Sequence, residues 1–77
     1  MSSQDALKLK DLGNQAFQAG KFEEAVSFFT QAIEINPQDH VFFSNRSGSY
    51  SSLQKYEEAL EDATMCVALK PDWAKGY

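Results

Sequence analysis

Two lysines and two asparagines have the types and spacing to bind one ligand together. Lys10 and Asn14 are four residues apart, so on a helix their side chains share a face. Asn45 and Lys75 come later, at positions that a repeated helical architecture brings beside this face. Ammonium groups donate charge-assisted hydrogen bonds, and asparagine amides both donate and accept. The set predicts a groove that binds a carboxylate-bearing ligand.

Each of these residues also has an ordinary structural explanation. Lys10 or Lys75, taken singly, would pass as a surface lysine, and Asn14 as an amide tolerated at an exposed position. Asn45 is harder to explain in this way, because asparagine is mildly unfavourable inside a helix. Phe17 would either contact an apolar residue of the ligand or pack in the core.

No catalytic or metal-binding motif accompanies this set. The single cysteine, Cys66, falls on an apolar stripe and is interpreted as a small buried side chain. His40 has no cluster of ligating side chains around it in the sequence, which argues against a metal site. Arg46 is expected to bridge to a neighbouring acid. The sequence therefore predicts neither an enzyme nor a cofactor.

An internal sequence repeat supplies the helices that position these residues. The segment at 21–25, KFEEA, recurs as KYEEA at 55–59, and Pro37 recurs as Pro71. The two recurrences have the same offset, which matches a period of about 34 residues known in helical repeat proteins. Because five consecutive positions and a proline agree in phase, we interpret the chain as a repeat array.

Each unit is predicted to form a helix, a turn and a second helix. Ser2 and Asp5 have capping-box spacing at the first start, and Gly20 can adopt the left-handed conformation that ends a helix. Asn36-Pro37 stops the second helix. The first helix has an apolar stripe of Leu9, Leu12 and Ala16, and the second has one of Phe22, Ala25, Phe29, Ala32 and Ile33.

The second unit repeats this plan. Asp39 is expected to cap a helix that runs to about residue 53, and the next helix runs to about residue 70, before Pro71. Asp72 can cap the start of a third unit. The apolar stripe of the fourth helix is Tyr56, Ala59, Ala63 and Cys66. The helix over about 39–53 lies between the two copies of the motif and is expected to be the middle helix of the array.

Composition limits the class of protein. At 77 residues the chain is expected to be one domain or less, and 13% aromatic residues argue against disorder. A net charge of −4 argues against nucleic-acid binding. No apolar run approaches the roughly 20 residues that span a bilayer, and no signal peptide is recognised. One cysteine fits a reducing compartment, so a cytoplasmic protein without membrane contact is expected.

Charge is predicted to sort between the two helices of each unit. The basic residues of first helices are Lys8, Lys10, Arg46 and Lys75, against only Asp5 and Asp11. The acidic residues of second helices are Glu23, Glu24, Glu34, Glu57, Glu58, Glu61 and Asp62. A chain that is acidic overall would then present a locally basic groove. The alternative is that these charges only solvate the surface.

The two units resemble the tetratricopeptide repeat family. The first supplies the family's large and small positions with Leu9, Leu12-Gly13, Ala25, Phe29, Ala32 and Pro37, and the second with Phe43, Tyr50, Ala59 and Pro71. The chain departs from the pattern at Ala16, Arg46-Ser47, Ala63 and Cys66. The resemblance implies an all-α superhelix with repeats at about 6–39 and 40–73 and the start of a third at 74–77.

The candidate residues also resemble the carboxylate clamp of chaperone-binding members of this family, most closely those of Hop-type (Hsp-organising protein) co-chaperones. The resemblance implies that Lys10, Asn14 and Asn45 hold the terminal carboxylate of a Glu-Glu-Val-Asp tail, and that Lys75 engages its Asp side chain. The family's fifth clamp residue would fall two residues after Tyr77, and Ser52 replaces a residue that is often basic.

The leading hypothesis is therefore a module that captures the acidic C-terminus of a heat-shock chaperone, with the seventy-kilodalton class favoured by the resemblance. A second hypothesis is a structural fragment that self-associates, because repeat arrays generally need about three units to be stable alone. A third is the targeting arm of an enzyme such as a phosphatase or prolyl isomerase.

Overall fold

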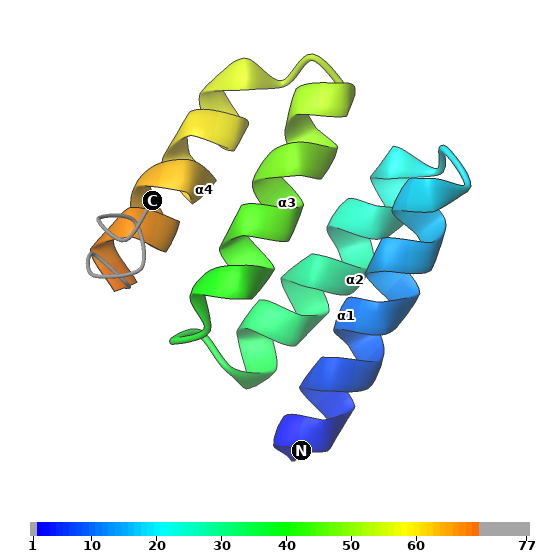
Figure 1. The fold of residues 1–77 in the computed structure, drawn as a ribbon, viewed down its shortest axis with the longest axis vertical. Coiled ribbons are helices and arrows are strands. Elements are labelled where there is room, and N and C mark those ends of the chain that lie inside the picture. Colours follow the sequence, from blue (N-terminus) through cyan, green and yellow to red (C-terminus); the bar gives the residue numbers. More distant parts are fainter. Residues whose placement is uncertain (1, 70–77) are drawn as a thin grey trace.

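Four helices account for most of residues 2–69, the part of the chain that the computed structural model describes (Figure 1). They are α1 (Ser3–Gln18), α2 (Phe22–Ile35), α3 (His40–Ser52) and α4 (Tyr56–Leu69). The predicted all-α architecture of helix-turn-helix units is confirmed. The expected start of a third unit, with Pro71 and Asp72, lies outside the described residues.

Side-chain caps begin two of the helices where the sequence predicted them. The backbone N–H of Asp5 donates to Ser2 Oγ at 3.4 Å, and the N–H of Ser2 donates to the Asp5 carboxylate at 3.1 Å, which completes a capping box. Asp39 Oδ1 accepts from the N–H of Val41 at 2.9 Å at the start of α3. Each cap satisfies backbone donors that the helix leaves unpaired.

The two turns within the units close in the same way. The N–H of Lys21 donates to the carbonyl of Ala16 at 2.8 Å, and at the same place in the second unit the N–H of Lys55 donates to the carbonyl of Tyr50 at 2.9 Å. This geometry needs a left-handed residue just before the donor. Gly20 fills it with a φ of 79°, as predicted, whereas Gln54 holds a φ of 62° with a side chain attached.

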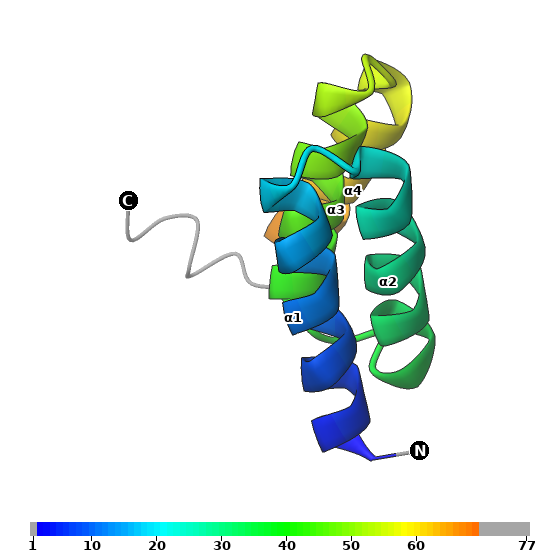
Figure 2. The same ribbon diagram turned by 90° about the vertical axis from the view of Figure 1, so that its right-hand side faces the viewer.

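Helix α3 is the middle element, as expected, and packs on α2 and α4 while also touching α1. Figure 2 shows α1 and α2 separating to opposite sides when the fold is viewed from the side. Small residues let the helices approach closely. One buried cluster joins Ala6 and Ala32 to Phe42, and a second joins Ala16 and Ala25 to Phe29.

The closest approach between α1 and α2 depends on a residue without a side chain. A Cβ on Gly13 would lie 2.5 Å from Cε1 of the buried Phe29 ring. In the second unit Ser47 stands in place of Gly13, and Ala63 stands in place of Phe29. Because Ala63 is smaller than Phe29, it leaves space for the side chain of Ser47. Ser47 Oγ uses that space to donate to the carbonyl of Ala59 at 2.7 Å.

Three residues of the predicted apolar stripes are exposed. Leu12 is 42% exposed, Tyr56 is 64% exposed, and Ala63 is also exposed. Leu12 is partly exposed to solvent because no described helix precedes α1. Tyr56 and Ala63 lie on α4, the last described helix, so no later described helix covers them. The corresponding residues of α2, Phe22 and Phe29, belong to the helix that α3 covers.

Within residues 2–69, no helix is both long enough and apolar enough to cross a membrane.

Substituting the two interior helix glycines is expected to change stability in opposite directions. Gly13→Ala drives a methyl into the Phe29 ring and should lower the free energy of unfolding by about 1–3 kcal/mol. Gly48→Ala meets only Phe17 Cε2 at 4.0 Å, an ordinary contact, so its better helix propensity should raise that free energy by about 0.5–1 kcal/mol. Urea unfolding measures both, and equal effects would contradict the packing described here.

Candidate ligand-binding groove

A hollow of about 170 Å³ lies between α1 and α3. Helix α1 supplies one wall and α3 the other, and the Phe29 ring from α2 lies at its base. The lining residues are Asn14, Phe17, Phe29, Ser44, Asn45 and Gly48. Three of the residues proposed from the sequence, Asn14, Asn45 and Phe17, thus line one site although they come from different repeat units.

Asn14 and Asn45 both keep their side-chain amides available. Each is half-buried, and neither amide forms a hydrogen bond with another described residue. The backbone carbonyl of Asn45 accepts from Ser49 Oγ at 3.3 Å, so only the main chain of this residue is engaged. Two amides, each able to donate and accept, therefore line the same hollow.

Lys10 lies one turn before Asn14 on α1. It is half-buried, is not itself a lining residue of the hollow, and makes no ion pair with any described residue. Positions four apart on a helix are neighbours on its surface, so its ammonium group can reach the rim of the hollow. The other predicted lysine, Lys75, lies outside residues 2–69.

Phe17 does both of the things considered for it. Its ring packs edge-on against Phe22, with centroids 5.2 Å apart and an angle of 68° between the rings. The same side chain is 37% exposed and lines the hollow. It therefore belongs to the packing between α1 and α2 and presents an apolar surface to the groove.

Sequence reasoning missed three lining residues, and the repeat offset would have found two of them. Ser44 and Gly48 stand exactly one repeat after Lys10 and Asn14, so they occupy the same two positions on the next first helix. Gly48 leaves the hollow open because nothing but Phe17 lies within 4 Å of the place where its Cβ would be. Phe29 was assigned to the core alone.

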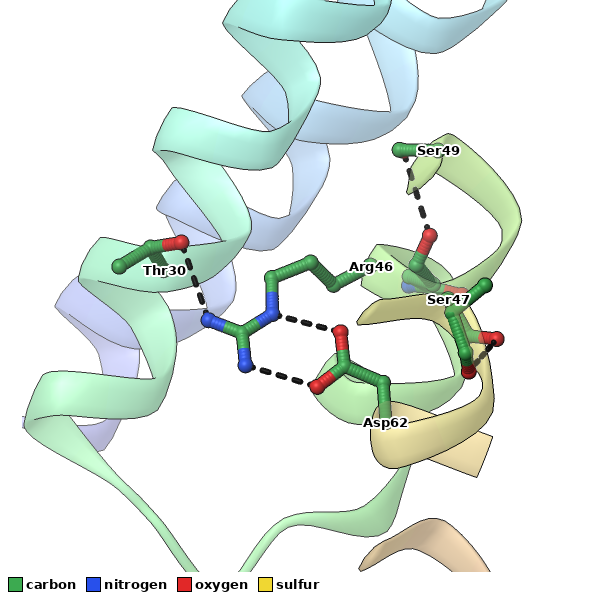
Figure 3. A network of polar contacts seen from close by, with 7 residues as sticks. Thr30, Arg46, Ser47, Ser49 and Asp62 are labelled. Carbon is green, nitrogen blue, oxygen red and sulfur yellow. Dashed lines mark hydrogen bonds and ion pairs between the residues drawn. The ribbon is translucent and has the colours of Figure 1, made fainter. Parts of the chain in front are cut away.

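Beside the groove, an ion pair joins α3 to α4 (Figure 3). Arg46 Nε and Nη2 donate to the two carboxylate oxygens of Asp62 at 2.7 and 2.8 Å, and Nη1 donates to Thr30 Oγ1 on α2 at 3.1 Å. The expected bridge from Arg46 to a neighbouring acid is confirmed. Asp62 lies on a second helix, as predicted, but it is 4% exposed, so the alternative that these charges only solvate the surface does not hold for it.

The ion pair also changes the charge expected in the groove. The hydrogen bonds from Arg46 to Asp62 outweigh desolvation and raise the pKa of the Arg46 guanidinium, so this side chain is charged. Its charge is nevertheless matched by Asp62, and Arg46 does not line the hollow between α1 and α3. Of the basic residues counted for α1 and α3, Lys8 and Lys10 remain available.

The described residues contain neither an activated cysteine nor a cluster of metal-ligating side chains. Cys66 is buried, and burial raises the pKa of its thiol, so it is protonated at neutral pH and has no thiolate to attack a substrate. No group of three or more Cys, His, Asp or Glu residues within 2–69 is arranged to hold a metal ion.

A larger hollow of about 380 Å³ lies on α1 and α2, lined by Leu9, Gln31, Glu34 and Ile35. It has no cation among its lining residues, and the carboxylate of Glu34 would repel an anionic ligand. For a carboxylate-bearing ligand the smaller hollow beside Lys10 is therefore the better candidate, although the other holds more space.

Comparison with known proteins gives consistent results. Residues 6–39 match the family described as Tetratricopeptide repeat. The Hsp70-Hsp90 organising protein of Plasmodium falciparum is 51% identical over all 77 residues, which cover 31% of that protein. A second relative of the same name and organism, also 51% identical over the whole chain, is covered to only 14%.

Solved structures share the fold. The first TPR of Spaghetti (RPAP3) bound to the HSP90 peptide SRMEEVD has a TM-score of 0.91 and 36% identity, over 97% of this chain and 60% of that one. The second TPR of the same protein, bound to the same peptide, has a TM-score of 0.89 and 36% identity, over 95% of this chain and 68% of that one.

Proposed function

The chain belongs to the tetratricopeptide repeat family, and on that premise we propose that it binds the acidic C-terminal Glu-Glu-Val-Asp tail of a heat-shock chaperone. The observation that carries the proposal is the hollow between α1 and α3, which two unengaged amides line and which lies one helical turn from Lys10. The relatives support it, since two solved ones are bound to a peptide that ends in EEVD.

Each groove residue has a role in this proposal. Lys10, Asn14 and Asn45 hold the terminal carboxylate of the tail, with the ammonium group supplying charge and the amides supplying direction. Lys75 engages the side chain of the final Asp. The apolar side chain that precedes this Asp enters the hollow beside Phe17, where Gly48 leaves room.

The seventy-kilodalton class of chaperone is our proposed partner, on the resemblance to the first domain of Hop-type co-chaperones. The two solved relatives are bound to an HSP90 peptide, which supports recognition of the shared four-residue ending in either class. The chain spans less than a third of the organising proteins that it matches, so the organising activity of those proteins is not assigned to it.

We propose that this module binds a partner, rather than catalysing a reaction, and that it does so in the cytoplasm. The relatives named above are organising proteins of chaperones, which favours binding over catalysis. The free thiol of Cys66 suits a reducing compartment.

Removing the negative charge at the end of the tail is expected to abolish binding. Each hydrogen bond to a charged group contributes about 1.5–3 kcal/mol before the costs of association, so a few of them give an affinity around the micromolar level. A labelled Glu-Glu-Val-Asp peptide, titrated with its C-terminus free or amidated, measures this. Lys10→Ala and Asn45→Ala should each weaken the free peptide by about tenfold or more.

Lys8→Ala is the matched control, because Lys8 is an exposed lysine two residues from Lys10 and on another face of α1. It should bind the free peptide as the parent does. Raising the salt concentration should weaken parent binding, because exposed charges are screened. Equal binding of the free and amidated peptides would refute the proposed carboxylate clamp.

Filling the hollow should weaken binding without unfolding the protein. Gly48→Leu places a branched side chain where the Val of the tail is proposed to sit, and we expect a loss of about tenfold or more, the amount that burying one such side chain contributes. A tail with Ala in place of Val should lose less on this substitution than the natural tail does. Unchanged binding by Gly48→Leu would place the Val side chain elsewhere.

One observation favours self-association as a second candidate. Tyr56, Leu60 and Val67 lie on one face of α4 and are each about half exposed or more, with Leu60 at 68%. Sedimentation over a range of concentrations measures this: self-association predicts a mass that rises with concentration and falls on Leu60→Glu. A monomer at every concentration would remove this candidate.

A further inference from the structure

We propose that Arg46 is a positioning residue, whose contacts with Thr30 and Asp62 set the rotation of α3 that turns Asn45 into the groove. The inference rests on the proposed function, because it concerns how the same site is held. Consecutive residues on a helix point about 100° apart, so a contact that fixes the direction of Arg46 also fixes that of Asn45.

The contacts of Arg46 leave α3 little freedom to turn about its axis. Two nearly parallel hydrogen bonds join the guanidinium to the carboxylate of Asp62, and a third reaches Thr30. The planar fork matches a carboxylate in one orientation, unlike an ammonium group. The Arg46 side chain is 18% exposed and that of Asp62 is 6% exposed, so solvent replaces these contacts poorly. We call these three residues the latch.

The latch connects three helices to one point. Thr30 belongs to α2, Arg46 to α3 and Asp62 to α4 (Figure 3). The guanidinium of Arg46 therefore fixes the rotation of α3 relative to both α2 and α4. The rings of Phe43 and Tyr50 flank it, each with its centroid 5.7 Å from Cζ. Such packing restricts the arginine rotamer further.

The first unit has uncharged residues at the two corresponding positions. Leu12 and Phe28 stand one repeat before Arg46 and Asp62, on the corresponding helices. An apolar pair is therefore compatible with the fold at these two positions. Replacing a buried ion pair by apolar residues of similar volume is often neutral or stabilising, so the ion pair is not needed for stability. What an apolar pair lacks is a preferred direction.

Both groove amides are adjacent in sequence to a residue that fits against α2. Asn14 follows Gly13, whose close approach to Phe29 fixes α1 on α2. Asn45 precedes Arg46, whose bond to Thr30 fixes α3 on α2. Helix α2 is thus the common reference that sets the spacing between the two amides. A binding site tolerates errors of only about 0.5 Å and 10–20° in such a spacing.

The test replaces the latch with the apolar pair of the first unit, Arg46→Leu with Asp62→Phe. Urea unfolding should show that the double variant is folded and as stable as the parent, whereas its affinity for the free Glu-Glu-Val-Asp peptide should fall about tenfold. Thr30→Val removes only the bond to α2 and should weaken binding in the same direction. Its matched control is Thr64→Val, the corresponding position on α4, where Thr64 Oγ1 donates to the carbonyl of Leu60 and to no other residue within 2–69.

A double-mutant cycle shows whether the latch acts through Asn45. In an Asn45→Ala background the latch substitutions should cause no further loss of affinity, whereas in a Lys10→Ala background their effect should remain in full. A merely structural role would weaken binding equally in both backgrounds. Equal losses in the two backgrounds, or a double variant that binds as the parent does, would overturn the proposal.

A measurement on the unliganded protein separates this proposal from the proposed function. Residual dipolar couplings of backbone amides report the orientation of α3 relative to α1, and the latch predicts one orientation in the parent and an altered or averaged one in the double variant. If the parent fails to bind the peptide, the proposed function is wrong, but these couplings still show whether the latch sets the orientation of α3. Identical couplings in parent and variant would refute it.

Discussion

The contact of the Phe29 ring with Gly13 is the constraint on which the groove depends. The ring is buried between α1 and α2 and leaves no space for a side chain on Gly13. The same ring lies at the base of the hollow that Asn14 and Asn45 line. One side chain therefore sets the distance between the first two helices and the depth of the site. In the second unit Ala63 takes the place of this ring, and the hollow of that unit is lined by charged residues, among them Arg46 and Glu58.

The two units are copies in sequence but hold their helices together by different means. The first uses close contact of apolar side chains, while the second places a charged pair, Arg46 and Asp62, where the first has Leu12 and Phe28. A buried ion pair adds little net stability, because desolvation offsets attraction. Its directional hydrogen bonds matter more for a helix that has neighbours on both sides and contributes a groove residue.

The charges of this chain act locally, and the net charge gives a poor account of the groove. Asp62 is counted with the acids, but its charge is matched by that of Arg46, so the pair adds no net charge. Lys10, by contrast, has no acidic partner among the described residues and lies one helical turn before Asn14, one of the two groove amides. An acidic protein can therefore receive an acidic ligand, because the nearest unpaired charge decides the local potential.

The sequence by itself determined the features that depend on neighbours along the chain. The caps at Ser2 and Asp39, the left-handed turn at Gly20 and the repeat period were all readable, because a capping or turn residue acts on backbone within a few positions of itself. The tertiary structure alone decided which faces meet. It buried Asp62, exposed Tyr56 and brought Phe29 and Gly48 into the groove, because these outcomes depend on which neighbouring helix covers each face.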